Sequence, residues 1–332
     1  MFQPPMDFLI GPLMLAAAKA GNTGLFIFIL GYIQNIHFED DSNETALHKA
    51  ADRGHKDIVR LLLRRGASIE AINIYNNTPP HLAARNGHSS TLELLLRNRT
   101  LIAPICRSSN NTPLHVAAWY GHASTVKLLL EQGALIDAMN GSNYAPLHFA
   151  AQNGHTRTVK LLLEKGASVK ATKKFNTPLH LAARNGHASV IELLLEKGAL
   201  IEARNESNYT PLHFAVMRGQ TSTVELLLEK GAQIEARTNY NNTALHLAAE
   251  HGHTSMVELL LEKGSLIEAK NNYYHTPLNH AVMNSCTGVV KILLREGASI
   301  EHIDSYGNTP LVWAELEGYN DIAQVLYTKA AG

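Results

Sequence analysis

The sequence predicts an all-α solenoid of stacked helix–turn–helix units joined by short β-hairpin-like fingers. Three observations carry this prediction. A Thr-Pro-Leu-His tetrapeptide, or a close variant, recurs at intervals of 32 to 34 residues. Each copy is followed by small residues and a glycine, and then by a leucine-rich run with helical spacing. Apolar residues make up 45% of the chain and charged residues 17%, so the array can bury a core.

The copies of the tetrapeptide define the organisation of the chain. They begin at Thr45, Thr78, Thr112, Ala145, Thr177, Thr210, Thr243, Thr276 and Thr309. We therefore expect an N-terminal segment with a degenerate capping repeat over residues 1–44, eight repeats over 45–308, and a C-terminal capping repeat over 309–332. Terminal repeats have one neighbour only, so departures from the pattern are expected there.

The repeat that begins at Thr177 shows how one unit is predicted to fold. Thr177 is a good N-cap, and Pro178 suits the first helical position, where no N–H is needed. Gly186 ends this first helix, and residues 190–195 give the second helix an apolar stripe. Residues 200–203 are predicted to be extended before the chain turns back. One unit cannot bury both helices alone, so stacking creates the core.

This pattern resembles the ankyrin-repeat family. The resemblance covers about residues 12–332 and corresponds to about ten repeats, including degenerate terminal caps. It implies a stand-alone protein-binding scaffold or adaptor, not an enzyme. In this family, partners usually meet the finger tips and the exposed face of the first helix, which together form the concave side.

Histidine is abundant, and its positions argue for a structural role. Of 18 histidines, seven end the tetrapeptide and six follow a glycine near the end of the first helix. The two sets are His48, His81, His115, His148, His180, His213 and His246, and His55, His88, His122, His155, His187 and His253. None has a carboxylate or cysteine at the spacing of a zinc site, so we expect no metal and no cofactor. The family resemblance implies that these rings bond to neighbouring loop carbonyls.

Several classes of function are disfavoured by the sequence. There is no phosphate-cradling glycine loop, no zinc-protease helix motif and no nucleophile elbow, and neither Cys106 nor Cys286 has a distinctive local motif. Basic and acidic residues number 29 each, whereas a sequence-independent nucleic-acid binder normally carries a basic excess. We therefore expect neither catalysis nor nucleic-acid binding.

The N-terminus and the cysteines bear on location. No basic residue precedes the apolar residues 8–18, and Asp7 stands where a signal peptide would be positive, so we expect neither secretion nor a membrane span. Two cysteines are too few for a disulfide framework. The prediction is a cytoplasmic or nuclear protein. Close similarity among the repeats over residues 145–270 leaves open a secreted effector of an intracellular microbe, which would bind a host protein in the host cytosol.

The first repeat is unusually apolar. Residues 13–22 match a first helix in degenerate form, and residues 25–30 match a second helix. Ile27 stands where internal repeats mostly place a charged residue. Two interpretations stay open: residues 1–10 fold back over this cap, or the cap is a partner-binding or self-association surface.

Positions that the repeat does not need for folding are candidates for partner binding. Two adjacent aromatic residues cannot both face the core, so Trp119 and Tyr120 are the predicted anchors. The predicted footprint centres on the repeats that start at Thr112, Ala145 and Thr177. Tyrosine, tryptophan and arginine are enriched at binding hot spots. The full predicted set is Trp119, Tyr120, Tyr144, Gln152, Phe175, Arg184, Tyr209, Arg218, Tyr240 and His251.

Two details of this set stay open. Arg184 and Arg218 are expected on one row of first helices, where they suit acidic groups of a partner. The finger tyrosines have an alternative role, because they can pack against neighbouring fingers and stiffen the array.

Overall fold

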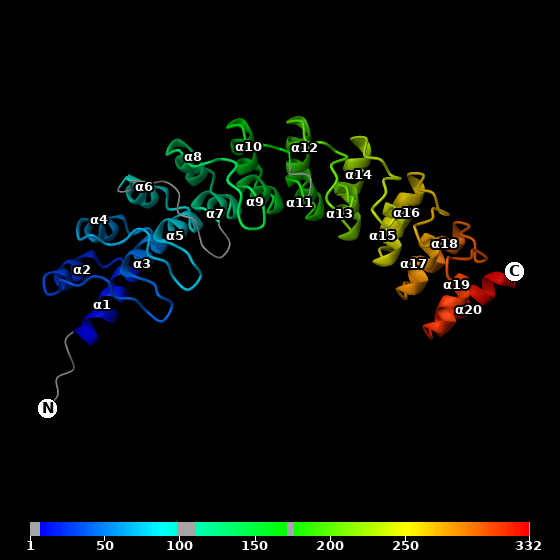
Figure 1. Ribbon diagram of the computed structural model, residues 1–332, viewed down its shortest axis with the longest axis horizontal. Helices are drawn as coiled ribbons and strands as arrows, with labels where there is room; N and C mark the ends of the chain where they lie inside the picture. Colours follow the sequence, from blue (N-terminus) through cyan, green and yellow to red (C-terminus); the bar gives the residue numbers. More distant parts are fainter. Residues whose placement is uncertain (1–6, 98–110, 171–175, 332) are drawn as a thin grey trace, which may run out of the picture. The chain divides into compact units, whose positions relative to one another are not determined.

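The computed structural model describes residues 7–97, 111–170 and 176–331. The chain forms two compact units, unit 1 over Met1–Ser168 and unit 2 over Val169–Gly332, each built from pairs of helices (Figure 1). Every regular element in the described residues is a helix, and the only strand-like pairing there is an isolated bridge between Glu39 and Thr45. The all-α prediction is confirmed, and the fingers are turns, not paired strands.

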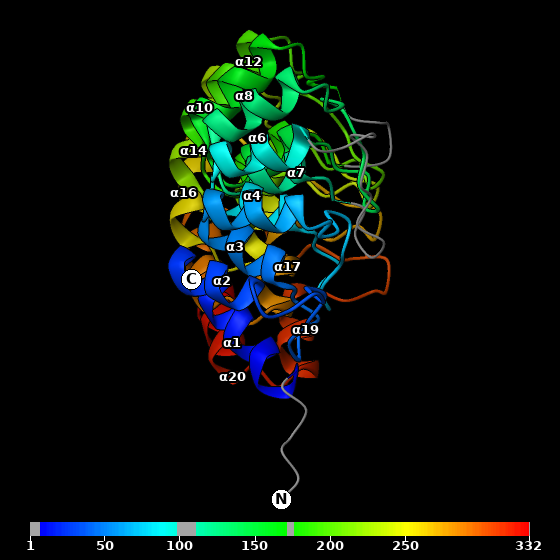
Figure 2. The same cartoon turned by 90° about the vertical axis from the view of Figure 1, so that its left-hand side faces the viewer.

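The helices of unit 1 form two rows. Each first helix packs against the next first helix, each second helix packs against the next second helix, and every pair is closed by contacts between its two members. The fingers lie on the side of the first helices (Figure 2). The pairs are α1 (Asp7–Ala20) with α2 (Thr23–Leu30), α3 (Ala46–Arg53) with α4 (Lys56–Arg64), α5 (Pro79–Arg85) with α6 (Ser89–Arg97), α7 (Pro113–Trp119) with α8 (Ala123–Glu131), and α9 (Pro146–Gln152) with α10 (Thr156–Glu164).

Unit 2 repeats the same arrangement, with first helices in one row and second helices in the other. The pairs are α11 (Pro178–Arg184) with α12 (Ala188–Glu196), α13 (Pro211–Met217) with α14 (Thr221–Glu229), α15 (Ala244–Glu250) with α16 (Thr254–Glu262), α17 (Pro277–Met283) with α18 (Thr287–Arg295), and α19 (Pro310–Leu316) with α20 (Asn320–Ala330). The alanines of the first helices, such as Ala182 and Ala183, are fully buried, which lets the helices approach closely.

The tetrapeptide histidine caps its own helix and ties it to the next finger. In the repeat at Thr177, the Thr177 backbone N–H donates to His180 Nδ1 at 3.0 Å, so this nitrogen carries no proton. His180 Nε2 therefore holds the proton and donates to the carbonyl of Tyr209 at 2.9 Å. The same pair of bonds recurs at His48, His81, His115, His213 and His246.

The second histidine set ties each repeat to the one before it. His155 Nε2 bonds to the carbonyl of Trp119 at 2.8 Å, and His122 Nε2 bonds to the carbonyl of Arg85 at 2.9 Å. Both carbonyls lie at the end of a first helix, where no helical partner remains. His55, His88 and His253 make the equivalent bond. The predicted structural role of these rings is confirmed where their bonds are described.

A third set of bonds links successive fingers. Asn205 Oδ1 accepts the N–H groups of Ser207 and Tyr209 within its own turn, and its Nδ2 donates to Asn176 Oδ1 at 2.9 Å. Asn73, Asn140 and Asn271 repeat this arrangement, each reaching back to the preceding finger. The fingers are therefore held to one another by side-chain hydrogen bonds.

One detail of the sequence prediction is wrong. Residues 200–203 form a turn closed by a bond from the Ala203 N–H to the Leu200 carbonyl at 3.0 Å, and they are not extended. Of the segment that could fold back over the first repeat, residues 7–10 form the first turn of α1, and residues 1–6 lie outside the described residues. Ile27 and Phe28 of α2 remain 53% and 62% exposed, as the apolar cap predicts. No helix in the described ranges has both the length and the apolar character needed to cross a bilayer.

The buried histidines make the fold sensitive to acid. Burial disfavours the charged ring and lowers the pKa to about 4 for His115, His180 and His213 and to about 3 for His246. The unfolded value is near 6.5, so the unfolded chain binds more protons between about pH 6.5 and pH 4. Stability is therefore complete above about pH 6.5 and falls as the pH drops through this window.

We predict that the thermal unfolding midpoint falls steadily between pH 7 and pH 4. Each such histidine contributes up to about 1.4 kcal/mol per pH unit. His246→Asn keeps the cap, as Asn279 does at the same position of the next repeat, where its Oδ1 accepts the Thr276 N–H at 3.0 Å. This variant should be less stable at neutral pH and show a shallower pH dependence than wild type. A pH dependence as steep as that of wild type would contradict the assigned role of the ring.

In the described fingers, a left-handed residue lies two positions before the N-cap of the following first helix. Asn43, Asn76, Asn143, Asn208 and Asn241 fill this position with φ between 54° and 66°, and Gly307 fills it with φ of 83°. Tyr274 occupies the same position with φ of 60°. Asparagine and glycine tolerate this conformation, whereas a bulky side chain is strained in it. The Tyr274 ring is 58% exposed, so packing offsets little of that strain.

Replacing Tyr274 by Asn should raise the free energy of unfolding by roughly 1 kcal/mol, because the left-handed strain is relieved. Urea denaturation measures the change. Tyr75→Asn is the matched control, because Tyr75 is also exposed but is not among the residues with positive φ. The strain assignment is refuted if the Tyr274 variant is no more stable than wild type.

Candidate functional site

The predicted anchors of unit 1 line a groove between the first helices and the fingers. This Trp119 groove has a volume of about 290 Å³. It is lined by Asn77, Arg85, Asn111, His115, Val116, Trp119, Tyr120 and Phe149. Small and mostly apolar grooves with a few polar groups are the usual form of recognition sites.

The backbone of Trp119 is held by a hydrogen bond, and part of its ring is exposed. It is the last residue of α7, and its carbonyl accepts the bond from His155 described above. Its ring meets Phe149 of α9 edge-on, with centroids 5.1 Å apart, and remains 39% exposed. The indole N–H has no hydrogen-bond partner among the described residues. A pre-positioned ring with an unused donor suits binding, because little side-chain freedom is lost.

Tyr120 is the second predicted anchor, and the cationic side chain of Arg85 lies against its ring. It is the C-cap of α7 and is 45% exposed. The Arg85 guanidinium lies over its ring at 5.8 Å from the centroid, within the range of a cation–π contact. Among the described residues that line the groove, Arg85 is the only charged one. These residues make the site aromatic with a single positive charge.

Of the other predicted residues of unit 1, Tyr144 packs in the wall of the Trp119 groove and Gln152 lies outside the groove. Tyr144 stacks on His148 with centroids 5.2 Å apart and meets Phe149 edge-on at 6.0 Å, so its ring braces the wall of the groove. Its carbonyl is also the acceptor of His115. For Tyr144 the packing alternative is the better description. Gln152 ends α9 and does not line the groove.

In unit 2 the predicted residues do not form one cluster. Tyr209 packs edge-on against His213 and Phe214, again as part of the scaffold, and burial raises its pKa. His251 stacks on His253 and donates from Nδ1 to the Leu247 carbonyl at 2.9 Å. Arg218 is exposed, and Arg184 is half-buried at the end of α11. Phe175 lies outside the described residues.

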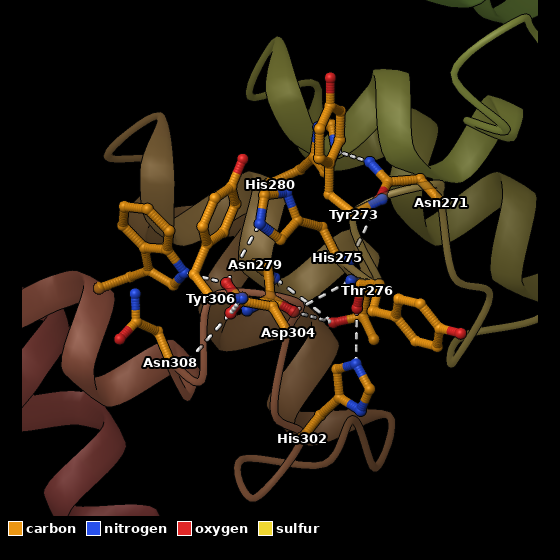
Figure 3. A network of polar contacts seen from close by, with 12 residues as sticks. Asn271, Tyr273, His275, Thr276, Asn279, His280, His302, Asp304, Tyr306 and Asn308 are labelled. Carbon is orange, nitrogen blue, oxygen red and sulfur yellow. Dashed lines mark hydrogen bonds and ion pairs between the residues drawn. The ribbon is translucent and has the colours of Figure 1, made fainter.

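Tyr240 lines a second groove, which the sequence did not predict. This Glu250 groove has a volume of about 510 Å³, and its walls include Tyr240, Glu250, Tyr273, Met283, Tyr306 and Trp313. Beneath the rings lies a network centred on Asp304 (Figure 3). Asp304 Oδ2 accepts from Trp313 Nε1 at 2.6 Å and from His275 Nε2 at 3.1 Å.

Asp304 is buried yet stays ionised. Burial acts to raise the pKa of this carboxyl, but hydrogen bonds from the Asn308 N–H, the Trp313 indole and the Tyr306 N–H outweigh it and hold the pKa below its ordinary value. In the earlier fingers this position is mostly Asn, which donates to the preceding finger. Aspartate cannot donate, so the donor is now His275, whose pKa is lowered chiefly by burial.

The sequence held a signal for this groove. Five histidines fall outside the two repeated sets, and His275 and His280 are among them. They depart from the pattern in the same repeat where Asn279 replaces the usual histidine. Departures that cluster in one repeat indicate positions that do not follow the structural pattern of the other repeats. Phe149 was missed for the opposite reason, because its position is apolar in most repeats.

Comparison with known proteins settles the family. A model for ankyrin repeats (3 copies) matches residues 13–103, 71–140, 114–205, 199–271 and 265–332. The chain belongs to the ankyrin-repeat family. The crystal structure of the human ASB11 ankyrin repeat domain is similar, with a TM-score of 0.60 and 30% sequence identity, covering 66% of this chain and 98% of that chain. No curated protein sequence matches the chain significantly.

Ankyrin repeats are generally scaffolds for protein–protein interaction. The two grooves of this ankyrin-repeat chain are consistent with that general role. Both are open and lined by aromatic residues. The described residues contain no group of three or more potential metal ligands.

Proposed function

We propose that this protein is a non-enzymatic scaffold that binds a partner protein through the Trp119 groove of unit 1. The observation that carries the proposal is the pair Trp119 and Tyr120, which is held at the backbone by His155 and exposed at both rings. Buried aromatic anchors supply most of the energy of protein interfaces. The face formed by first helices and fingers is the proposed recognition surface.

The charge of the groove defines the kind of segment it accepts. Arg85 contributes one positive charge, and none of the described lining residues is a carboxylate. A segment with an apolar or aromatic side chain followed by a carboxylate would place the side chain against Trp119 and Phe149. Its carboxylate would then meet Arg85, which can bind it through two parallel N–H donors.

The test begins with affinity capture from cell lysate and then measures Kd for the captured protein. Trp119→Ala with Tyr120→Ala should weaken binding by about 2–4 kcal/mol. Tyr327→Ala, which removes another exposed tyrosine on α20, is the matched control and should bind like wild type. All variants are compared by thermal unfolding first. Unchanged affinity of the double variant, or a large fall in its unfolding midpoint, would count against the proposed site.

The role of Arg85 has a separate test. Arg85→Gln removes the charge while keeping a polar side chain, and it should weaken binding of the same partner by about tenfold. The salt dependence of binding should also become shallower, because a charge pair is lost. If affinity and salt dependence both stay as in wild type, the partner does not place an acidic group at Arg85.

A further inference from the structure

The Glu250 groove of unit 2 has an aromatic wall built from one repeated position. Tyr240, Tyr273 and Tyr306 are spaced 33 residues apart and are 56%, 42% and 62% exposed. Tyr273 and Tyr306 lie nearly parallel, with centroids 6.4 Å apart and an interplanar angle of 14°. Trp313 stands perpendicular to Tyr306, with centroids 6.2 Å apart. The groove therefore presents several ring faces.

The rings are held in place from below. His275 is 5% exposed and lies under Tyr273, Tyr306 and Trp313, at centroid distances of 5.9, 6.1 and 6.0 Å. Asp304 fixes His275 and Trp313 through the same carboxylate oxygen (Figure 3). Asp304 itself is buried beneath the groove and is not part of its lining. Its charge is taken up by four hydrogen-bond donors.

The hydrogen-bond network also determines where the proton of His280 lies. Asn271 Oδ1 accepts the N–H groups of Tyr273 and His275, so the orientation of this amide is fixed. Its Nδ2 donates to Asn242 and also faces His280 Nε2 at 3.1 Å. His280 Nε2 must therefore be an unprotonated acceptor, and the ring proton sits on Nδ1. Figure 3 shows Asn271 beside the ring.

This assignment leaves the charge of Glu250 uncompensated. Neutral His280 approaches Glu250 Oε2 from Nδ1 at 3.4 Å and lowers the pKa of the carboxyl, so Glu250 is ionised. No lysine or arginine forms an ion pair with Glu250 in the described part of the chain. Glu250 is half-exposed at the end of α15, and Met283 at the end of α17 lies in the same groove.

We propose that the Glu250 groove is a second binding site, which accepts a lysine or arginine side chain from a basic segment of a partner protein. The cation lies against the Glu250 carboxylate and over the tyrosine faces, where both the charge and the ring quadrupoles attract it. Its aliphatic stem packs on Met283 and the rings. The preferred charge is opposite to that of the Trp119 groove, where Arg85 is the one charged residue in the described lining.

The experiment uses the full chain with Trp119→Phe, which leaves Trp313 as the sole tryptophan. The probes are four acetylated, amidated peptides of sequence Ala-Leu-Xaa-Leu-Ala, in which Xaa is arginine, lysine, citrulline or glutamate. Saturation of the change in Trp313 emission gives Kd. We expect the arginine and lysine peptides to bind, and the neutral citrulline peptide to bind about tenfold more weakly than its arginine isostere.

Glu250→Gln should abolish the difference between arginine and citrulline. Glu225→Gln removes an exposed carboxylate of α14 and should preserve the difference. Equal binding of the arginine and citrulline peptides, absence of a saturable signal, or a preserved difference in Glu250→Gln would each overturn the proposal. The Trp119 groove has lost its tryptophan in every sample, so these outcomes are independent of the function proposed for unit 1.

Discussion

The bond from a tetrapeptide histidine to the carbonyl of the next finger is the interaction on which the structure depends. Its Nδ1 accepts the N–H of its own helix cap, which forces the proton onto Nε2 and aims it at the following repeat. One ring thus joins a helix start to a carbonyl 29 residues later, at the end of the next finger. Because the ring is buried, an unmade bond would leave a polar group without a partner, which costs more than a typical bond contributes.

Asn279 shows what this histidine adds. It reproduces the cap by accepting the Thr276 N–H, but its Nδ2 is buried and has no partner among the described residues. The amide is too short to join its helix to the next finger. In the same region, the bond between neighbouring fingers is made by His275 and Asp304 in place of the usual asparagine pair, and Asp304 also orients Trp313. The repeat that has Asn279 in place of the usual histidine therefore also contributes to the Glu250 groove.

The same scaffold presents two grooves of different chemistry. First-helix ends and finger positions are held by bonds that use backbone atoms, so their side chains can vary without loss of the fold. In unit 1 these positions supply Trp119, Tyr120 and Arg85, and in unit 2 they supply Tyr240, Glu250 and Tyr306. Side-chain identity at a few repeated positions therefore sets the charge and shape of each surface.

Much of this fold could be predicted because each repeat contains the same residues at its helix starts, helix ends and core positions. The Thr-Pro start, the glycine stop and the leucine stripe placed the helices, and the recurrence of histidine indicated its structural role. The roles of single finger residues could not be predicted. Tyr144 directly precedes its helix cap and packs against Phe149, whereas Tyr240 lies three positions before its cap and is exposed.

The binding chemistry of the Glu250 groove could not be predicted for a related reason. It depends on which atom of Asn271 faces His280, and this orientation is fixed by hydrogen bonds that the repeat pattern does not specify.

The most direct test of the account is the protonation state of the histidine rings. Nitrogen–proton correlation NMR of the imidazoles at about pH 6 distinguishes neutral rings from charged ones and identifies the nitrogen that holds the proton. Our account predicts that the buried tetrapeptide histidines, including His115, His180, His213 and His246, are neutral and carry the proton on Nε2. Charged rings, or neutral rings with the proton on Nδ1, would contradict it.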